Sequence, residues 1–529
     1  MIVAEEPRLG GAHLGFLAVL IVLGFWLKLG SLPLFDLDEG AFSEATIEML
    51  DSGNYLSTTL NGQPRYDKPI LIYWLQAASV HSFGRNEFAF RLPSAIAATL
   101  WLLVVYRYTF GFTRERNAAL LAAGSLGLGV MSSIIGHAAI ADALLNLLIA
   151  LTMLDVYRYF GSPQRAYVLR VYFWMALGFL TKGPIAIALP LIVGSVFYVW
   201  HGRGRIWLRA LFNLRGWVVF FAVTLPWVVL LYRQDGGEFF RHFLLDHNLN
   251  RYGSTLQGHG GKPWYYLVML PLIVLPFTAL LPAALKRAHS ADPLDRYLLL
   301  WFMAVFVFFS FSGTQLPHYL LYGSTPLFVL FGRFWREVPA RFWTLLPALL
   351  ISALFTALPW ILPQVQPGDE RPYESGIIAI AMSSFGDVDL ILGGIVMLGL
   401  LILLFRPGLA PWRAVLGAAV LLNLQLWFSI APILAEAQQT PIREAARRAR
   451  ELRLPVVAYH TFLPSFSVYY GAVTPNRLPD PGELAFVRLD RIEDLQRELG
   501  ASVTLIPEYK RGGVALLLRQ VGPGDPLGR

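Results

Sequence analysis

A series of apolar runs dominates the chain, each about as long as the helix that crosses a lipid bilayer, roughly 20 residues. Short polar segments separate the runs, and arginines concentrate in every second segment. Because lipid offers no partner to an exposed backbone amide, such runs must fold as helices. We predict about thirteen spans, near residues 12–29, 92–110, 118–136, 139–160, 166–182, 184–200, 216–232, 264–285, 296–312, 317–334, 342–362, 386–405 and 412–430.

The composition agrees with an α-helical polytopic membrane protein. Of the 529 residues, 56% are hydrophobic and 15% are charged, more apolar sequence than a water-soluble core needs. The net charge of +8 does not indicate nucleic-acid binding, because the basic residues are dispersed between the apolar runs. The chain has no cysteine, which excludes disulfides and thiolate chemistry. Glu5 and Glu6 precede the first run, so we expect a retained span rather than a signal peptide.

The arginines predict which way each loop faces. Cytoplasmic loops are enriched in Lys and Arg. An odd number of spans then places the N-terminus in the cytoplasm, and the long first loop (30–91) and the C-terminal tail on the outer side. The arginine-rich loops predicted to face the cytoplasm lie near residues 107–116, 158–170, 203–215, 286–296, 333–341 and 406–413.

Two regions outside the spans are predicted to be ordered. In the first loop, apolar residues recur at helical spacing from Phe42 to Leu50, Glu44 and Glu48 lie on the opposite face, and Gly53 follows as a stop signal. We expect this amphipathic helix to lie along the membrane surface.

The C-terminal tail has the pattern of a small α/β domain, with helices predicted at 441–453 and 491–499 and strands at 456–460, 485–489, 503–507 and 514–518. We therefore expect a membrane domain over residues 1–431 and a second domain over residues 432–529.

Polar residues gather at the outer ends of the spans. Asp38 and Glu39 begin the first-loop helix, where capping is the alternative interpretation. Asp142 lies at or just inside a span, where an ionisable group is costly without a cavity or a partner, although a cap is again an alternative. Lys68 precedes an apolar stretch and fits an interfacial anchor equally well. Other polar residues predicted on this side are Lys182, His247, Arg251 and Tyr319.

The shared location of these residues is the observation that favours chemistry. Together they could line one cavity, with carboxylates for a reacting hydroxyl or phosphate and cations for a phosphate leaving group. Asp67, His247 and His259 are candidate ligands for a divalent metal, but their spacing is not that of a paired-histidine helix, and hydrogen bonding within a loop is the commoner role. No glycine-rich phosphate loop stands between a strand and a helix.

The ordered motifs of the outer side resemble those of the polyprenyl-phosphate-sugar-dependent glycosyltransferases of the GT-C class. The resemblance is to the bacterial family that includes the aminoarabinose transferase of lipid A and, more distantly, to protein O-mannosyltransferases. The motifs are Asp36-Leu37-Asp38-Glu39-Gly40, Arg65-Tyr66-Asp67-Lys68-Pro69, Tyr73-Trp74-Leu75-Gln76-Ala77, Arg91-Leu92-Pro93, Thr181-Lys182-Gly183-Pro184, His247-Asn248-Leu249 with Arg251, and Leu316-Pro317-His318-Tyr319.

The resemblance implies a GT-C fold with an outward C-terminal α/β domain and an inverting transfer of aminoarabinose or a related sugar. The implied donor is undecaprenyl phosphate, the leading acceptor is a lipid A phosphate, and the implied location is the periplasmic face of a bacterial inner membrane. It implies a monomer surrounded by membrane lipids, no nucleic acid, and no certain cofactor, with a divalent metal left open. Expected catalytic residues are Asp38 and Asp142, and expected substrate-binding residues are Glu39, Lys68, Lys182, Arg251 and Tyr319.

Two positions depart from the family pattern. Gln315 stands where the family often has lysine, and Ala41-Phe42 stands where an arginine often follows the Asp-Glu pair. Alternative acceptors are protein hydroxyls and surface polysaccharide. A lipid-linked sugar transporter is an alternative from another class, although its charges should lie near the bilayer centre rather than at one face. A non-catalytic envelope scaffold is a further alternative.

Overall fold

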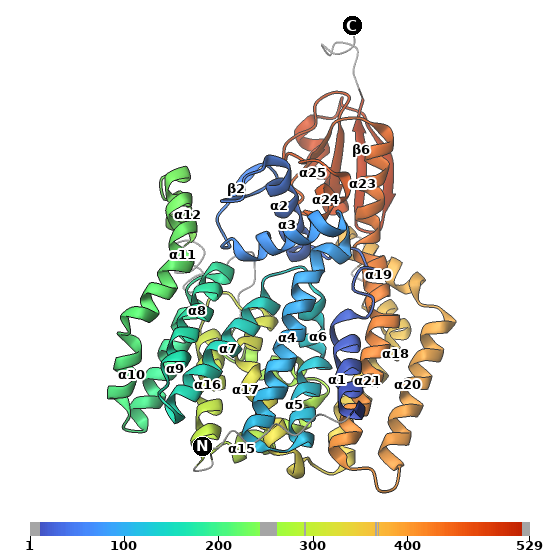
Figure 1. Cartoon of the computed structure of the whole chain (residues 1–529). Helices are drawn as coiled ribbons and strands as arrows, with labels where there is room; N and C mark the ends of the chain where they lie inside the picture. The colour runs from blue at the N-terminus through green and yellow to red at the C-terminus, as the bar shows by residue number, and fades with distance from the viewer. Residues whose placement is uncertain (1–10, 244–261, 290–291, 366–367, 369, 521–529) are drawn as a thin grey trace.

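The bundle of apolar helices and the smaller C-terminal sheet stand end to end in the computed structural model, which describes residues 11–243, 262–289, 292–365, 368 and 370–520. In Figure 1 the sheet stands at one end of the bundle, above the two helices of the first loop, and helix α10 lies at the opposite end. The first half of the bundle contains α1 (Gly11–Ile21), the π-helical η1 (Val22–Trp26), α4 (Glu87–Thr113), α5 (Arg116–Gly127), α6 (Val130–His137), α7 (Asp142–Gly161), α8 (Arg165–Lys182), α9 (Ile185–Trp200), α10 (Gly204–Leu211), α11 (Leu214–Asp235) and α12 (Glu238–Arg241).

The second half continues the bundle and ends in a long helix that leads to the C-terminal sheet. Its elements are α14 (Tyr265–Ile273), η3 (Phe277–Leu280), α15 (Leu281–Arg287), α16 (Pro293–Ser310), η4 (Pro317–Gly323), α17 (Ser324–Arg333), η5 (Trp335–Glu337), α18 (Arg341–Ile361), η6 (Leu362–Gln364), α19 (Pro372–Ser384), α20 (Asp387–Phe405), α21 (Pro411–Gln425), η7 (Leu426–Ile430) and α22 (Ala431–Gln438).

All thirteen predicted runs contain helix, but they differ in length and straightness. Among the described residues, seven helices are long and apolar enough to cross a membrane, or nine if each of two bent pairs counts as one span. The α5–α6 pair bends by 61° at Leu128, which stands between Gly127 and Gly129. The second pair, α14 with η3–α15, bends by 111° before Pro276, whose ring removes a helix hydrogen bond. The chain is a multi-pass membrane protein, and the count of thirteen spans stays a prediction.

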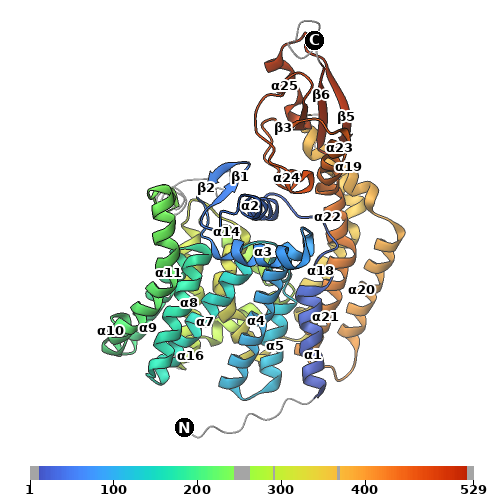
Figure 2. The same cartoon turned by 45° about the horizontal axis from the view of Figure 1, so that its top comes forward.

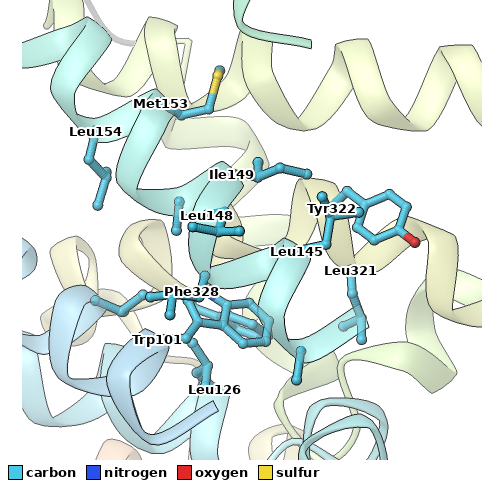
Figure 3. Close-up of a cluster of buried hydrophobic side chains, with 14 of the residues drawn as sticks. Trp101, Leu126, Leu145, Leu148, Ile149, Met153, Leu154, Leu321, Tyr322 and Phe328 are labelled. Carbon is cyan, nitrogen blue, oxygen red and sulfur yellow. The ribbon is translucent and has the colours of Figure 1, made fainter. Parts of the chain in front are cut away.

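The bundle is held together by large buried side chains from several helices. Trp101 of α4 is fully buried and donates its indole N–H to Oγ1 of Thr325, 2.9 Å away in α17. Figure 3 shows Leu145 and Leu148 of α7 beside it, and Tyr322 at the edge with its hydroxyl pointing away from the cluster. This packing fixes α4, α7 and η4 against one another, and all three lead to the candidate site.

The first loop forms two helices and a hairpin. The elements are α2 (Asp38–Ser52), β1 (Thr58–Leu60), β2 (Gln63–Arg65) and α3 (Leu71–Phe83), and β1 pairs with β2 in an antiparallel register. The predicted helix and its stop signal are confirmed, because Gly53 ends α2 with a φ of 68°, a left-handed conformation that glycine adopts without strain. Phe42 stacks on Tyr73 of α3 with ring centroids 5.3 Å apart.

The polar face of α2 is not the surface that the amphipathic pattern suggests. Glu44 and Glu48 are only 3% and 9% exposed. The hairpin covers Glu48, whose carboxylate accepts a hydrogen bond from Gly62 N at 3.2 Å, and residues of α24 (Ser465–Tyr470) cover the helix from the other side. The pattern correctly predicted the buried apolar face, whereas contacts made by distant segments bury the acidic one.

The C-terminal segment carries a four-stranded sheet of order β3-β4-β6-β5, with β3 parallel to β4 and the other pairs antiparallel. Its elements are α23 (Thr440–Leu452), β3 (Val456–Ala458), α24, β4 (Leu484–Arg488), η8 (Leu489–Arg491), α25 (Ile492–Leu499), β5 (Leu505–Arg511) and β6 (Val514–Arg519). Figure 2 shows this sheet and α24 above α2. The predicted helices and strands are present, although β5 begins and ends later than predicted.

The predicted division between residues 431 and 432 falls inside a helix. The helix that begins at Pro411 continues through α22 to Gln438. Pro432 does not end it, because the wider π-helical turn of η7 precedes the proline, and such turns accommodate a missing amide donor. Residues 1–431 and 432–529 as separate domains therefore stay a prediction.

Asp36 joins the first loop to the C-terminal segment. Its carboxylate accepts a hydrogen bond from Ser465 N at 3.0 Å and another from the Ser465 hydroxyl. The approach is close, since a Cβ on Gly40 would lie 2.6 Å from Ser465 N. Burial raises the pKa of Asp36 from 3.8 to about 7, against the lowering effect of the Ser465 hydrogen bonds, and the nearby charge of Glu39 raises it further.

We predict that this contact makes stability depend on pH. A carboxyl whose pKa is higher in the folded than in the unfolded protein contributes stability that is complete below pH 4 and is lost as the pH rises to about 7. The free energy of unfolding should fall between pH 5 and pH 8 by roughly 1–2 kcal/mol less in Asp36→Asn than in the unchanged protein. Thermal unfolding of both proteins in detergent between pH 5 and pH 8 measures it. If the stability difference between the two proteins is the same at pH 5 and pH 8, Asp36 is not the source of the pH dependence.

Candidate functional site

A buried ion pair anchors the start of α2. Arg91 of α4 contacts both carboxylate oxygens of Glu39 at 2.8 Å, and the two side chains are 5% and 6% exposed. The same guanidinium donates to the carbonyl oxygens of Leu29, Leu32 and Pro33. Glu39 also accepts from Phe35 N at 2.8 Å and from Ala139 N at 2.7 Å. The pair therefore ties the first loop, α4 and the turn before α7 into one unit.

Asp38 is exposed one residue away, at the first position of α2. Over the part of the chain that the structure describes, its carboxylate makes no hydrogen bond or ion pair. It lies close enough to Arg65, Tyr73 and His318 to interact with each electrostatically. The positive end of the helix dipole favours an ionised carboxylate at this position. Asp38 is thus held in place by its neighbour and is itself available to a ligand.

Arg65, Asp67 and Lys68 form one group beside Asp38. Nε of Arg65 lies 2.6 Å from Oδ1 of Asp67, and Nζ of Lys68 lies 3.2 Å from Oδ2. Burial alone would raise the pKa of Asp67, but the charges and hydrogen bonds of Arg65 and Lys68 hold that pKa well below its usual range. Lys68 Nζ donates to Asp67 twice, through Oδ2 and the carbonyl oxygen, so one of its three N–H donors is left for a ligand.

Arg65 also explains one departure from the family pattern. Its guanidinium packs over the ring of Phe42 at 4.9 Å and donates to the carbonyl oxygen of Ala41 at 2.5 Å. Ala41 and Phe42 are the two positions at which the sequence departs from the expected arginine. A guanidinium from the second motif therefore lies against both of them.

Asp142, Lys182, Tyr322 and His318 form a second group. Lys182 Nζ lies 2.7 Å from Oδ1 of Asp142, and the Tyr322 hydroxyl donates to the same oxygen at 2.5 Å. Nε2 of His318 lies 3.7 Å from that oxygen. Lys182 Nζ also lies 2.7 Å from the Tyr322 hydroxyl. These two contacts use two of the three N–H donors of the ammonium, so one is left for a ligand.

Tyr319 completes this group from η4. It is buried, and its ring lies 5.2 Å from Nζ of Lys182 and is stacked with Tyr322. Such contacts between an ammonium and an aromatic face are attractive and help to hold Lys182 in place.

Both groups lie near His318. This histidine interacts electrostatically with Asp142 and Lys182 of one group and with Asp38 and Lys68 of the other. The sequence therefore brings together the ends of α2, α7 and α8 with η4 and the segment before α3. The site combines one open carboxylate with lysines that retain donors, an arrangement suited to binding phosphate next to a reacting hydroxyl or sugar.

Most predicted site residues that the structure describes lie in this cluster, namely Asp38, Lys68, Asp142, Lys182 and Tyr319. Their chemical roles stay predictions. Glu39, expected to bind substrate, is buried and its oxygens are taken up by Arg91 and by backbone amides, so its substrate-binding role stays a prediction. Arg251, His247 and His259 lie outside the described residues.

The metal interpretation finds no support in the part of the chain that is described. No group of three or more His, Asp or Glu side chains there is placed to hold a metal ion. Asp67 is the candidate ligand that lies within the described residues, and its carboxylate oxygens already accept hydrogen bonds from Arg65 and Lys68. Whether a metal binds with the help of residues outside the described ranges stays open as a prediction.

His318, Arg65 and Arg91 belong to the motifs but have no role predicted from the sequence, and Tyr322 lies outside every motif. A signal existed for Arg91, since an arginine at the start of a span needs a buried partner. Tyr322 lies three residues after Tyr319, so both rings can project to one side of the 3₁₀ segment η4.

Comparison with known proteins gives the same fold. The crystal structure of ArnT from Cupriavidus metallidurans bound to undecaprenyl phosphate superposes with a TM-score of 0.81 at 20% identity, over 97% of this chain and 98% of that one. The family model described as dolichyl-phosphate-mannose-protein mannosyltransferase matches residues 67–230.

Two sequence relatives add to the comparison. One is the undecaprenyl phosphate-alpha-4-amino-4-deoxy-L-arabinose arabinosyl transferase of Shewanella sediminis, 30% identical over 60% of this chain and 59% of its own. The other is a protein of Aquifex aeolicus without an assigned function, 32% identical over 59% of this chain and 70% of its own. The chain thus spans about three fifths of the length of the arabinosyl transferase.

The helices and the superposition define a multi-pass membrane protein with the GT-C fold of ArnT. The chain belongs to one family with the Aquifex aeolicus protein, and it is similar to the arabinosyl transferases over about three fifths of their length.

We predict that substitutions of the two neighbouring acids change the free energy of unfolding by very different amounts. Glu39→Gln should lower the free energy of unfolding by about 3 kcal/mol, because it leaves the buried Arg91 charge without its carboxylate. Asp38→Asn removes an exposed carboxylate without a partner among the described residues and should change stability by less than about 0.5 kcal/mol. Thermal unfolding in detergent distinguishes them, and equal losses would contradict the structural role of Glu39.

Proposed function

We propose that the protein is an inverting glycosyltransferase that moves a sugar, aminoarabinose or a related one, from undecaprenyl phosphate to an acceptor of the cell envelope. The observation that carries the proposal is that the exposed Asp38 carboxylate, Lys68 and Lys182 all lie near His318, and that each lysine has an ammonium donor left for a phosphate. The names of the similar proteins, an arabinosyl transferase and an ArnT bound to undecaprenyl phosphate, support the same donor.

The chemistry of the donor fits the charges of the site. When the bond between the sugar and the phosphate breaks, negative charge grows on the leaving phosphate. Lys68, Lys182 and the Tyr319 hydroxyl are suited to stabilise that charge, and the proposed role of Arg251 is the same. Lys68 and Lys182 already neutralise the carboxylates of Asp67 and Asp142, so these acids do not repel a bound phosphate.

Asp38 is the proposed catalytic carboxylate. If the acceptor is a hydroxyl, Asp38 accepts its proton as a general base while the acceptor oxygen attacks the anomeric carbon. If the acceptor is an ionised phosphate of lipid A, which is the leading acceptor, no strong base is needed and Asp38 orients the sugar. Direct displacement inverts the anomeric centre in both cases. Asp142 orders Lys182 and Tyr322 and is proposed to act through them.

The proposed setting is the periplasmic face of a bacterial inner membrane. The proposed residues that the structure describes lie at the end of the bundle that carries α2 and the C-terminal sheet, whereas α10 and its arginines lie at the other end (Figure 1). Nucleotide sugars are absent from the periplasm, so a lipid-linked donor suits that location. We propose that the protein acts as a monomer.

Loss of either principal residue should abolish transfer. We predict that Asp38→Asn and Lys68→Ala each lower transfer from a polyprenyl-phosphate sugar at least about 100-fold in isolated membranes. The matched control is Glu374→Gln, which changes an acid at the start of α19, outside the site. Normal transfer by both site variants, at equal amounts of protein, would reject these roles.

The acceptor can be tested in cells. Mass spectrometry of lipid A from cells with and without the protein should show a mass increase that depends on Asp38. An unchanged lipid A profile would reject lipid A as the acceptor and direct the search to glycoproteins and surface polysaccharide.

A further inference from the structure

The end of the bundle opposite the candidate site carries a group of arginines without acidic partners. Arg205, Arg209 and Arg215 stand on α10 and at the start of α11, and all three are exposed. Within the described ranges, none of the three side chains makes an ion pair or a hydrogen bond. Three free cations so close in sequence create a positive patch that an anion would neutralise.

An apolar cavity of about 130 Å³ lies beside α10, the helix that carries two of these arginines. Trp207, Ala210 and Leu211 of α10 line it from one side and Trp217 from another, and residues of α7, α8 and α9 complete the wall. Arg209 lies close enough to Tyr159, another lining residue, to interact with it electrostatically. The helix that carries Arg205 and Arg209 therefore also forms one wall of the cavity, and Arg209 lies near a second wall.

A second apolar groove runs along the other side of Trp217. It is open, has a volume of about 750 Å³, and is lined by α11 from Leu214 to Leu230. Apolar side chains at this corner face outward, with Phe212 74% and Leu214 77% exposed. In a membrane protein, outward apolar grooves next to a span are surfaces for hydrocarbon rather than for water.

We propose that the α10–α11 corner is a binding site for an anionic phospholipid of the cytoplasmic leaflet. The headgroup phosphate binds Arg205, Arg209 and Arg215, part of one acyl chain enters the small cavity beside α10, and the other chain lies in the groove on the far side of Trp217. The site is separate from the candidate active site and does not depend on the proposed reaction.

Charge and shape together select this occupant. The positive-inside rule assigns the arginine-rich end to the cytoplasm, where the leaflet carries anionic lipids. A soluble phosphate compound would use the arginines but leave both apolar grooves empty. A zwitterionic lipid would fill the grooves, but its own cation would oppose the three arginines.

Native mass spectrometry of the full chain in detergent tests the proposal. The probes are phosphatidylglycerol and phosphatidylcholine with identical acyl chains. We expect phosphatidylglycerol to remain bound and phosphatidylcholine to bind at least about tenfold more weakly. Each arginine near a membrane surface is worth roughly a fivefold change in occupancy. The triple variant Arg205→Gln, Arg209→Gln, Arg215→Gln should therefore weaken phosphatidylglycerol binding by about tenfold or more.

Two further variants separate the parts of the site. Leu191→Trp changes a half-exposed residue that lines the cavity and should weaken phosphatidylglycerol binding although every arginine is kept. Arg406→Gln, in the loop between α20 and α21, removes an exposed arginine from elsewhere and should have no effect. Equal thermal midpoints check that the variants are folded.

Two results would overturn the proposal. One is unchanged phosphatidylglycerol binding by the folded triple variant. The other is displacement of phosphatidylglycerol by glycerol 3-phosphate, which would mean that only the headgroup is recognised.

Discussion

The geometry of the candidate site depends on the ion pair between Arg91 and Glu39. A buried charge is stable only when its partner and further hydrogen bonds satisfy it, and here backbone carbonyls of the first loop complete the guanidinium while Phe35 N and Ala139 N complete the carboxylate. The two ions therefore fix the start of α2 relative to the turn that precedes α7. Asp38 and Asp142 take their mutual position from this one contact.

Cations pair with the carboxylates of Asp67 and Asp142, which leaves Asp38 as the site carboxylate without such a partner among the described residues. Asp67 is held by Arg65 and Lys68, and Asp142 by Lys182 and Tyr322. Each lysine makes two short contacts, which fixes its ammonium group while a third donor remains. Preorganised donors of this kind need little rearrangement when negative charge develops nearby.

The sequence was sufficient for local features and insufficient for contacts between distant segments. Apolar runs, the α2 pattern with Gly53 and the alternation of the tail depend on neighbours in sequence, and each became the expected element. Glu39 looked equivalent to Asp38 because both begin one helix, and only the partner 52 residues away distinguishes them. Glu44 looked exposed for the same reason, since α24 covers it from the far end of the chain. Tyr322 gave no signal because its hydroxyl matters only next to Asp142.

Arg65 shows how such a site can keep its charge while its motif changes. The Ala41-Phe42 pair lacks the arginine that often follows the Asp-Glu pair, yet the guanidinium of Arg65 rests on the Phe42 ring and on the Ala41 carbonyl oxygen. A planar cation suits both contacts, because it stacks on an aromatic face and donates in its own plane. The ion pair with Asp67 offsets the cost of burying the Arg65 charge, and the same carboxylate also holds Lys68. Charge at this position is therefore a property of the folded site rather than of one residue in one motif, which is why the departure leaves the cation in place.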